Sequence, residues 1–175
     1  MYCYFDNCSE SILVFQNGDF DYRKISQEVR DSSRINLEEF QKEKWYLGCW
    51  KITNVLPSNN RVEKGVATFP IQIPRRLIEL YSYKGETVLD PFAGSATTLK
   101  AAIALGRQAV GYELDLELLE VIKRKAGTET GPDGKMPDME MIVRGDAKRL
   151  RTQLQRKVEA SRAKPNRVKT RSPSK

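Results

Sequence analysis

Apolar residues recur at two spacings along this chain. Alternation with polar residues predicts strands, and a recurrence every three to four residues predicts helices. The two patterns follow each other, so strands are expected to alternate with helices. Apolar, β-branched or aromatic runs predict strands at residues 12–15, 88–90, 109–114 and 139–143, and a strand or extended segment at 45–55. Helical spacing predicts helices at residues 37–43, from Pro74 onward, at 99–105 and at 115–125. This alternation is typical of an α/β fold, in which helical crossovers of right-handed sense link parallel strands.

One predicted strand ends in a carboxylate and passes through a glycine turn directly into an Ala-rich helix. Asp90 closes that strand, Pro91 and Gly94 shape the turn, and the amides of residues 95–97 would open the helix. Unpaired amides and the positive end of a helix dipole favour an anionic or polar ligand group beside the glycine. Many α/β proteins turn on a glycine and bind nothing there, so the loop is a weak indication by itself.

A second acid strengthens the hypothesis of a cofactor site. Glu113 lies at the end of the next predicted strand, 23 positions after Asp90, which is about the spacing at which an acid meets a ribose hydroxyl in dinucleotide-binding folds. The alternative is an ordinary surface carboxylate. The loop and the acid together predict a nucleotide-cofactor site at the carboxyl ends of two strands.

These segments resemble the S-adenosylmethionine motif of the DNA amino-methyltransferases, which methylate the exocyclic amine of adenine (N6) or cytosine (N4). The similar stretches are Asp90-Pro-Phe-Ala-Gly-Ser-Ala-Thr-Thr, Val110-Gly-Tyr-Glu, residues 69–82 and residues 9–18. The resemblance covers roughly residues 8–150. A Phe-Pro segment placed before the glycine loop is the order of the permuted branch, in which the catalytic half comes first in the chain.

The resemblance implies a Rossmann-like α/β fold with an incomplete sheet, a role in DNA methylation and restriction-modification, and S-adenosylmethionine as cofactor. Asp90 would face the methionine end of the cofactor, Glu113 the ribose and Asp146 the adenine amino group. Asp146 could instead cap a helix that begins near Lys148, and Phe69 and Pro70 could simply line the core. The implied cofactor-binding residues are Phe69, Pro70, Asp90, Pro91, Phe92, Ala93, Gly94, Ser95, Thr97, Thr98, Glu113 and Asp146.

The catalytic signature of that family is absent. It is an Asp, Asn or Ser followed by Pro-Pro and an aromatic residue, and this chain has no Pro-Pro pair. No catalytic residue is therefore assigned, and the chain resembles the carboxyl-terminal, cofactor-binding half. Ala96 also departs from the pattern, because a second glycine is usual there. If this position needs a positive φ, the methyl group costs about 1 kcal/mol.

Charge divides the chain into a domain at 1–150 and a basic tail at 151–175. Within that domain the resemblance implies a target-recognition segment at 19–60, for which the alternative is a solvated connecting loop. The formal charge is +7, but residues 144–175 carry 12 Lys and Arg against two acids, and the rest carries 18 against 21. Such a tail has the composition of a disordered segment that binds DNA phosphates without sequence preference. The alternative is a solvated tail with no partner.

The cysteine and histidine content and the lack of long apolar runs indicate the cellular compartment that is expected. Three Cys without a Cys-x-x-Cys pair, together with no His, indicate a reducing, cytoplasmic interior and no zinc or other metal site. No apolar run is long enough to span a membrane, and a signal-peptide pattern is absent. Three hypotheses remain: a subunit of a split DNA methyltransferase that needs a second polypeptide, an inactive remnant that binds cofactor or DNA, and a relative of RNA guanine methyltransferases.

Overall fold

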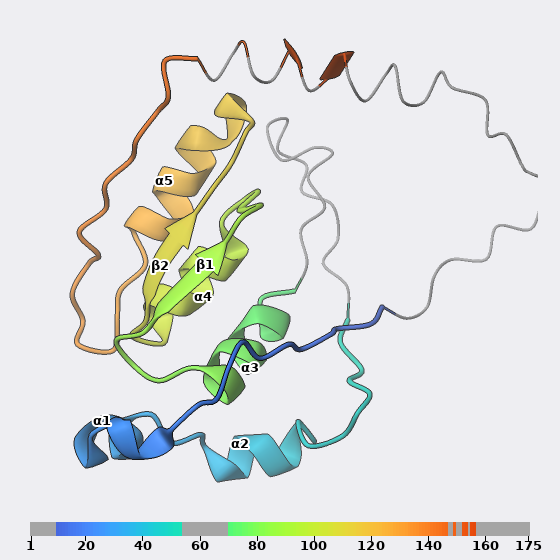
Figure 1. The fold of residues 1–175 in the computed structure, drawn as a ribbon, viewed down its shortest axis with the longest axis vertical. Coiled ribbons are helices and arrows are strands. Elements are labelled where there is room, and N and C mark those ends of the chain that lie inside the picture. The colour runs from blue at the N-terminus through green and yellow to red at the C-terminus, as the bar shows by residue number, and fades with distance from the viewer. Residues whose placement is uncertain (1–9, 54–69, 147–148, 150–151, 154, 157–175) are drawn as a thin grey trace, which may run out of the picture.

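The computed structural model describes residues 10–53 and 70–146, together with residues 149, 152–153 and 155–156. The amino-terminal part holds a short 3-10 turn, η1 (Tyr22–Lys24), and two short helices, α1 (Gln27–Ser32) and α2 (Leu37–Lys42). The part that follows residue 70 alternates helix and strand, as Figure 1 shows. Its elements are α3 (Gln72–Tyr81), β1 (Thr87–Asp90), α4 (Thr97–Ala104), β2 (Gln108–Gly111), η2 (Leu116–Leu118) and α5 (Leu119–Gly127).

The sheet within the described residues has two parallel strands. Thr87 pairs with Gln108 and Asp90 with Gly111, so both strands end at the same edge. Val88 and Ala109 pack against the helices, whereas Leu89 is 58% exposed. The helix α4 crosses over between the strands and lies along the sheet (Figure 1). The chain is thus an incomplete Rossmann-like α/β unit, in which one sheet face is open.

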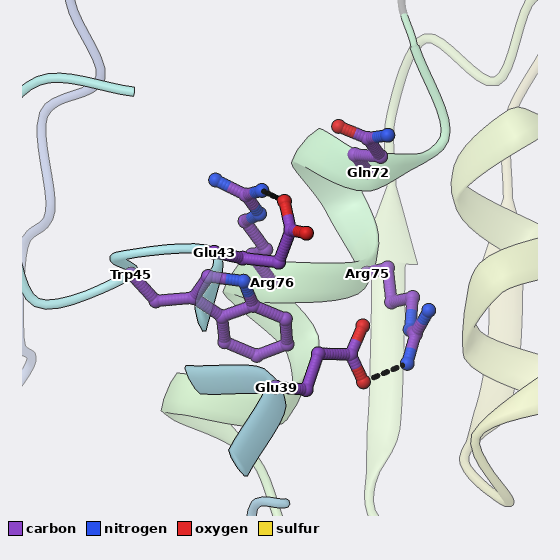
Figure 2. A pocket seen from close by; sticks show the side chains of 6 residues that line it. All are labelled: Glu39, Glu43, Trp45, Gln72, Arg75 and Arg76. Carbon is purple, nitrogen blue, oxygen red and sulfur yellow. Dashed lines mark hydrogen bonds and ion pairs between the residues drawn. The ribbon is translucent and has the colours of Figure 1, made fainter. Parts of the chain in front are cut away.

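The helices α1 and α2 precede α3 in the chain, and α2 docks on α3 through polar contacts. Arg75 Nη2 lies 2.8 Å from Glu39 Oε2, and Arg76 Nη2 lies 3.3 Å from Glu43 Oε2, both shown as dashed lines in Figure 2. The Arg76 guanidinium is also 5.4 Å from the ring centroid of Trp45 and 5.2 Å from that of Trp50. Cation–π contacts of this kind gain strength when the cation is desolvated, and Arg76 is only 4% exposed.

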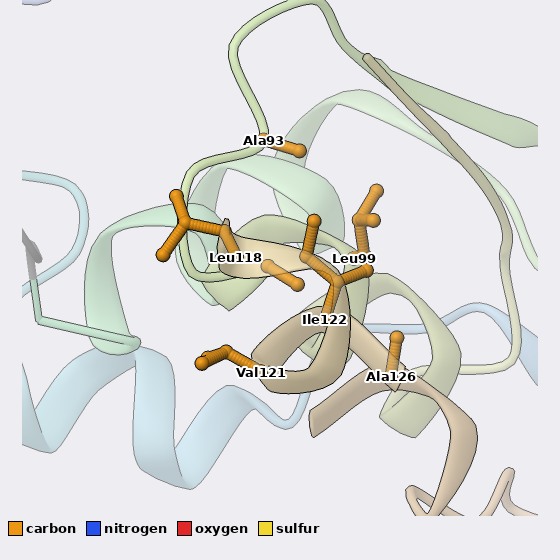
Figure 3. Close-up of a cluster of buried hydrophobic side chains, with 7 residues drawn as sticks. Ala93, Leu99, Leu118, Val121, Ile122 and Ala126 are labelled. Atoms are coloured by element: carbon orange, nitrogen blue, oxygen red, sulfur yellow. The ribbon is translucent and has the colours of Figure 1, made fainter. Parts of the chain in front are cut away.

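Two clusters of small and medium apolar side chains form the core. The first joins the loop after β1 to α4, η2 and α5 (Figure 3), and consists of Ala93, Ala96, Leu99, Leu118, Val121, Ile122 and Ala126. The second joins α3 to α4 and consists of Ile78, Ala101 and Ala102. Since alanines supply much of the α4 surface, its neighbours pack closely on both sides, and the helix becomes the centre of the unit.

Arg107 ties the ends of three elements together. Its side chain donates to Ser82 O (2.6 Å), to Leu105 O (2.7 Å) and to Ser82 Oγ (3.2 Å), so it joins the end of α3, the end of α4 and the start of β2. Burial lowers the pKa of the Arg107 guanidinium, and the nearby carboxylates of Glu79 and Glu86 oppose that shift.

Most predicted helices are confirmed, with shifted boundaries. The predicted helix at 37–43 is α2, whose Asn36 cap accepts from the amides of Glu38 and Glu39. The helix predicted from Pro74 begins two residues earlier, because proline fits the first turn. The helix predicted at 99–105 begins at Thr97, and that at 115–125 begins with η2 before α5. Sequence reasoning missed α1, although its cap, Ser26, is a preferred type.

Two predicted strands, at 88–90 and 109–114, are confirmed as β1 and the shorter β2, whereas the strands predicted at 12–15 and 139–143 are wrong. Residues 12–15 and 139–143 form no strand, since no described backbone lies in register beside them. Met139 and Met141 instead pack partly on the first core cluster. Of the strand or extended segment predicted at 45–55, residues 45–49 turn after α2, where the Trp45 amide donates to Phe40 O (3.0 Å). Residues 50–53 form no strand, and residues 54 and 55 lie outside the described residues.

The described helices are too short or too polar to cross a membrane. Most of the predicted tail at 151–175 lies outside the described residues, so its boundary and the domain at 1–150 stay predictions.

Candidate cofactor-binding site

The loop after β1 is held against the end of β2 by backbone hydrogen bonds. Tyr112 N donates to Asp90 O, and Ala93 N donates to Tyr112 O, both at 2.9 Å. The Asp90 side chain accepts from Phe92 N at 3.0 Å and so fixes the first turn of the loop. Sequence reasoning did not single out Tyr112, because its contribution comes from the backbone and leaves no residue-type signal.

The second half of the loop uses two left-handed residues to enter α4. Gly94 has φ 51° and Ala96 has φ 66°, and the Ala96 side chain is fully buried at 0% exposure. Ala96 N donates to Ala93 O at 2.7 Å, so this amide is engaged inside the loop. The sequence predicts instead that it is open to a ligand. The helix α4 begins without a side-chain cap, which leaves its first amides available to a polar ligand group.

The second acid reaches the glycine loop, as its position in the sequence predicts. Glu113 Oε2 accepts from Gly94 N at 2.8 Å, and its Oε1 accepts from Leu114 N and Asp115 N, both at 2.7 Å. One half-buried carboxylate therefore joins the ends of β1 and β2. A ribose hydroxyl at this place would donate to the same oxygens, so it would share or replace the Gly94 contact.

Close packing of β2 on α4 depends on Gly111. A Cβ atom at this position would lie 2.8 Å from Leu99 Cδ1, closer than real Cβ contacts, and 3.0 Å from Ala93 Cβ, so a larger residue here would displace Leu99. Sequence reasoning treated Gly111 only as part of a strand, although an isolated glycine in a strand indicates a close approach.

The other predicted site residues divide into three groups. Ala93 and Ser95 are buried, while Thr97 and Thr98 lie half-buried in the first turn of α4. Pro91 is exposed, and Phe92 is 86% exposed. Pro70 is half-buried at the start of the segment that leads into α3, and Phe69 lies outside the described residues.

Asp146 does not join the site through any contact among the described residues. Arg144 holds its carboxylate, with Arg144 Nε 3.1 Å from Oδ1 and Nη2 3.0 Å from Oδ2. Figure 1 shows residues 136–146 as an orange trace on the outer side of α5, separate from the sheet. The residues expected to follow it as a helix, from Lys148, are mostly outside the described residues, so neither the cofactor contact nor the cap is tested.

A cavity of about 140 Å³ lies between α2 and α3, and none of its lining residues belongs to the glycine loop. Among residues 10–53 and 70–146, no group of three or more His, Cys, Asp and Glu side chains is arranged to hold a metal ion.

Comparisons with known proteins agree with this geometry. A sequence model of the N6/N4 methyltransferase family, described as DNA methylase, matches residues 2–124. The type II methyltransferase M.MjaI of Methanocaldococcus jannaschii is 39% identical over 136 residues, which are 78% of this chain and 44% of that protein. The type II methyltransferase M.MthZI of Methanothermobacter thermautotrophicus is 35% identical, over 66% of this chain and 34% of that protein.

Among solved structures, TTHA0409 of Thermus thermophilus, a candidate DNA modification methylase, matches with a TM-score of 0.52 and 31% identity. The match covers 71% of this chain and 51% of that one. The present chain thus spans less than half the length of the two curated relatives and about half of the solved one.

Proposed function

The chain belongs to the N6/N4 DNA methylase family, and we propose that it is the cofactor-binding part of an S-adenosylmethionine-dependent DNA methyltransferase. The observation that carries this proposal is the hydrogen bond of 2.8 Å between Gly94 N and Glu113 Oε2. It brings a glycine loop, an uncapped helix start and a strand-end acid to one sheet edge, the arrangement in which α/β folds bind nucleotide cofactors.

Each part of this edge would bind a different part of the cofactor. Asp90 would take the methionine end, the loop from Pro91 to Ser95 and the first turn of α4 at Thr97 and Thr98 would enclose it, and Glu113 would accept from the ribose hydroxyls. Phe69 and Pro70 would flank it. Asp146 has no described contact with this edge, so it would have to leave its ion pair with Arg144 to accept from the adenine amine. The bound cofactor supplies an electrophilic methyl group, and the residues of this chain orient it.

The acceptor is proposed to be the exocyclic amine of cytosine or adenine in DNA. A flipped-out base needs a group that grips its amine, and the family does this with a Pro-Pro-aromatic signature that these 175 residues lack. That group would therefore come from outside them, either on a second polypeptide or elsewhere on a longer protein of the permuted order. The basic tail would add phosphate contacts.

A second candidate is a remnant that binds cofactor or DNA without catalysis. Ala96 favours it, since a left-handed conformation at a non-glycine residue stores strain in the loop that the cofactor would contact.

Calorimetry with S-adenosylmethionine tests the cofactor site. Asp90→Ala and Glu113→Ala should each weaken binding by about 1 to 3 kcal/mol, because each leaves polar partners unmatched. Glu120→Ala is the matched control, since that carboxylate lies on α5, is 83% exposed and pairs only with Lys123 among the contacts of the described residues. Wild-type affinity in both site variants would refute the proposed cofactor site.

A further inference from the structure

A second site lies outside the glycine loop, in the cavity between α2 and α3. Figure 2 shows six side chains around it: Glu39, Glu43, Trp45, Gln72, Arg75 and Arg76. The floor is formed by Trp45 and Arg76, each 4% exposed, while Gln72 and Glu43 lie at the open rim. The site therefore has a buried base and an accessible mouth.

The buried indole of Trp45 has an unused donor. Its Nε1 is buried and forms no hydrogen bond with any of the residues that the structure describes. Figure 2 shows this edge of the ring turned toward Glu43 and Arg76. The neighbouring Trp50 differs, because its Nε1 donates to Trp45 O at 3.0 Å. Since a buried N–H without an acceptor is costly, the cavity favours a ligand that carries an acceptor atom.

The charges in the cavity balance, which excludes a phosphate as the favoured ligand. Arg75 pairs with Glu39 and with Glu79, and Arg76 pairs with Glu43. An anion would meet the carboxylates of Glu39 and Glu43 as well as the guanidinium groups. A neutral group with both acceptors and donors suits the site better, because Glu39 and Glu43 can accept while Trp45 and Gln72 donate.

We propose that this cavity binds the edge of a nucleobase in the DNA, an inference that rests on the proposed function. Its volume of about 140 Å³ suits one aromatic ring, since a cavity of about 150 Å³ holds benzene in another protein. Arg, Gln and Glu are also among the side chains that hydrogen-bond base edges in DNA. The segment that carries Glu39, Glu43 and Trp45 lies within the predicted target-recognition segment at 19–60.

The two indole signals of the 175-residue chain give a direct test, because the chain has only two Trp residues. The ¹⁵N-labelled chain is titrated separately with each of the four 2′-deoxynucleosides, and a Trp50→Phe variant assigns the two peaks. At least one nucleoside should shift the Trp45 Nε1–H signal as the indole gains an acceptor, while the Trp50 signal stays in place. If none of the four nucleosides moves the Trp45 signal, the inference is wrong.

A pair of glutamine variants separates the cavity from the rest of the surface. Gln72→Ala removes a rim amide without disturbing the core and should lower the affinity for the nucleoside by about 5- to 100-fold. Gln41 is exposed on α2 and does not line the cavity, so Gln41→Ala should leave the affinity for the nucleoside unchanged. If Gln72→Ala and Gln41→Ala bind the nucleoside with equal affinity, the proposed site is wrong.

Calorimetry on the same sample distinguishes this inference from the proposed function. S-adenosylmethionine binding without any nucleoside shift would overturn the base site alone. A Trp45 shift without cofactor binding would support the base site and refute the cofactor site.

Discussion

Glu113 shows how one residue serves a loop and a ligand. Its carboxylate accepts three backbone amides, from Gly94, Leu114 and Asp115. Without cofactor, these bonds hold the glycine loop on the end of β2. A cofactor hydroxyl would compete for the same oxygens, so binding is expected to exchange one set of donors for another rather than to fill unused acceptors.

Ala96 gives a prediction about backbone strain. Ala96→Gly should change the free energy of unfolding by less than about 1 kcal/mol, because the relief of the left-handed conformation offsets the loss of a buried methyl group. Ala96→Val should destabilise by about 2 kcal/mol or more, since a β-branched side chain is strained at φ 66° and has no room at a fully buried position. Urea unfolding monitored by circular dichroism measures both.

The two variants at Ala96 control for each other, because they change the same position in opposite senses. A loss above about 2 kcal/mol for the glycine variant would mean that packing rather than strain decides this position.

At the scale of elements, Arg107 is the connection that joins α3, α4 and β2. Arg107→Lys should lower the free energy of unfolding by about 1.5 to 3 kcal/mol, because a lysine cannot reproduce the planar fork that reaches Ser82 O, Ser82 Oγ and Leu105 O. Thermal and urea unfolding of the two proteins measure the difference.

Arg144→Lys is the matched control for that prediction. Its side chain is 70% exposed and pairs with Asp146 two residues away, so the change should stay within about 0.5 kcal/mol. An equal effect of the two substitutions would show that the bonds of Arg107 are not what holds the three elements together.

Among the described residues, one face of the sheet is open. Leu89 and Val110 on the strands and Tyr112 just after β2 are exposed, although a parallel sheet normally has both faces covered. The chain also spans less than half of its curated relatives. Both observations agree with an arrangement in which further chain segments complete the sheet.

The chain by itself is therefore expected not to methylate DNA. A methyl donor reacts only when its acceptor is held in line, and no Pro-Pro-aromatic signature is present to hold it. The measurement is transfer of a labelled methyl group to mixed-sequence DNA by the purified chain. Adding a polypeptide that carries an Asp, Asn or Ser-Pro-Pro-aromatic motif should produce activity, with the same motif changed to Ala-Ala as the control.

Clear turnover by the isolated chain would contradict this expectation. It would place a catalytic group among residues to which only a structural role is assigned.

Local sequence was sufficient to predict the unit from β1 to β2 and the approach of Glu113 to the glycine loop. The strands, turn and helix of this unit are close in the chain, so the apolar period, the turn residues and the strand-end acids identify them. The absence of strands at residues 12–15 and 139–143 emerged from the fold instead, because a strand needs a backbone partner that can lie anywhere in the chain.

The fold alone also placed Arg76 between two indoles and left Trp45 Nε1 without a partner among the described residues, beside a cavity. These contacts join segments separated by many residues, and the residue types involved occur equally well on an open surface. The physical reason is common to the strands and the cavity: hydrogen bonding and burial depend on which distant groups the fold brings together, and no local pattern records that choice.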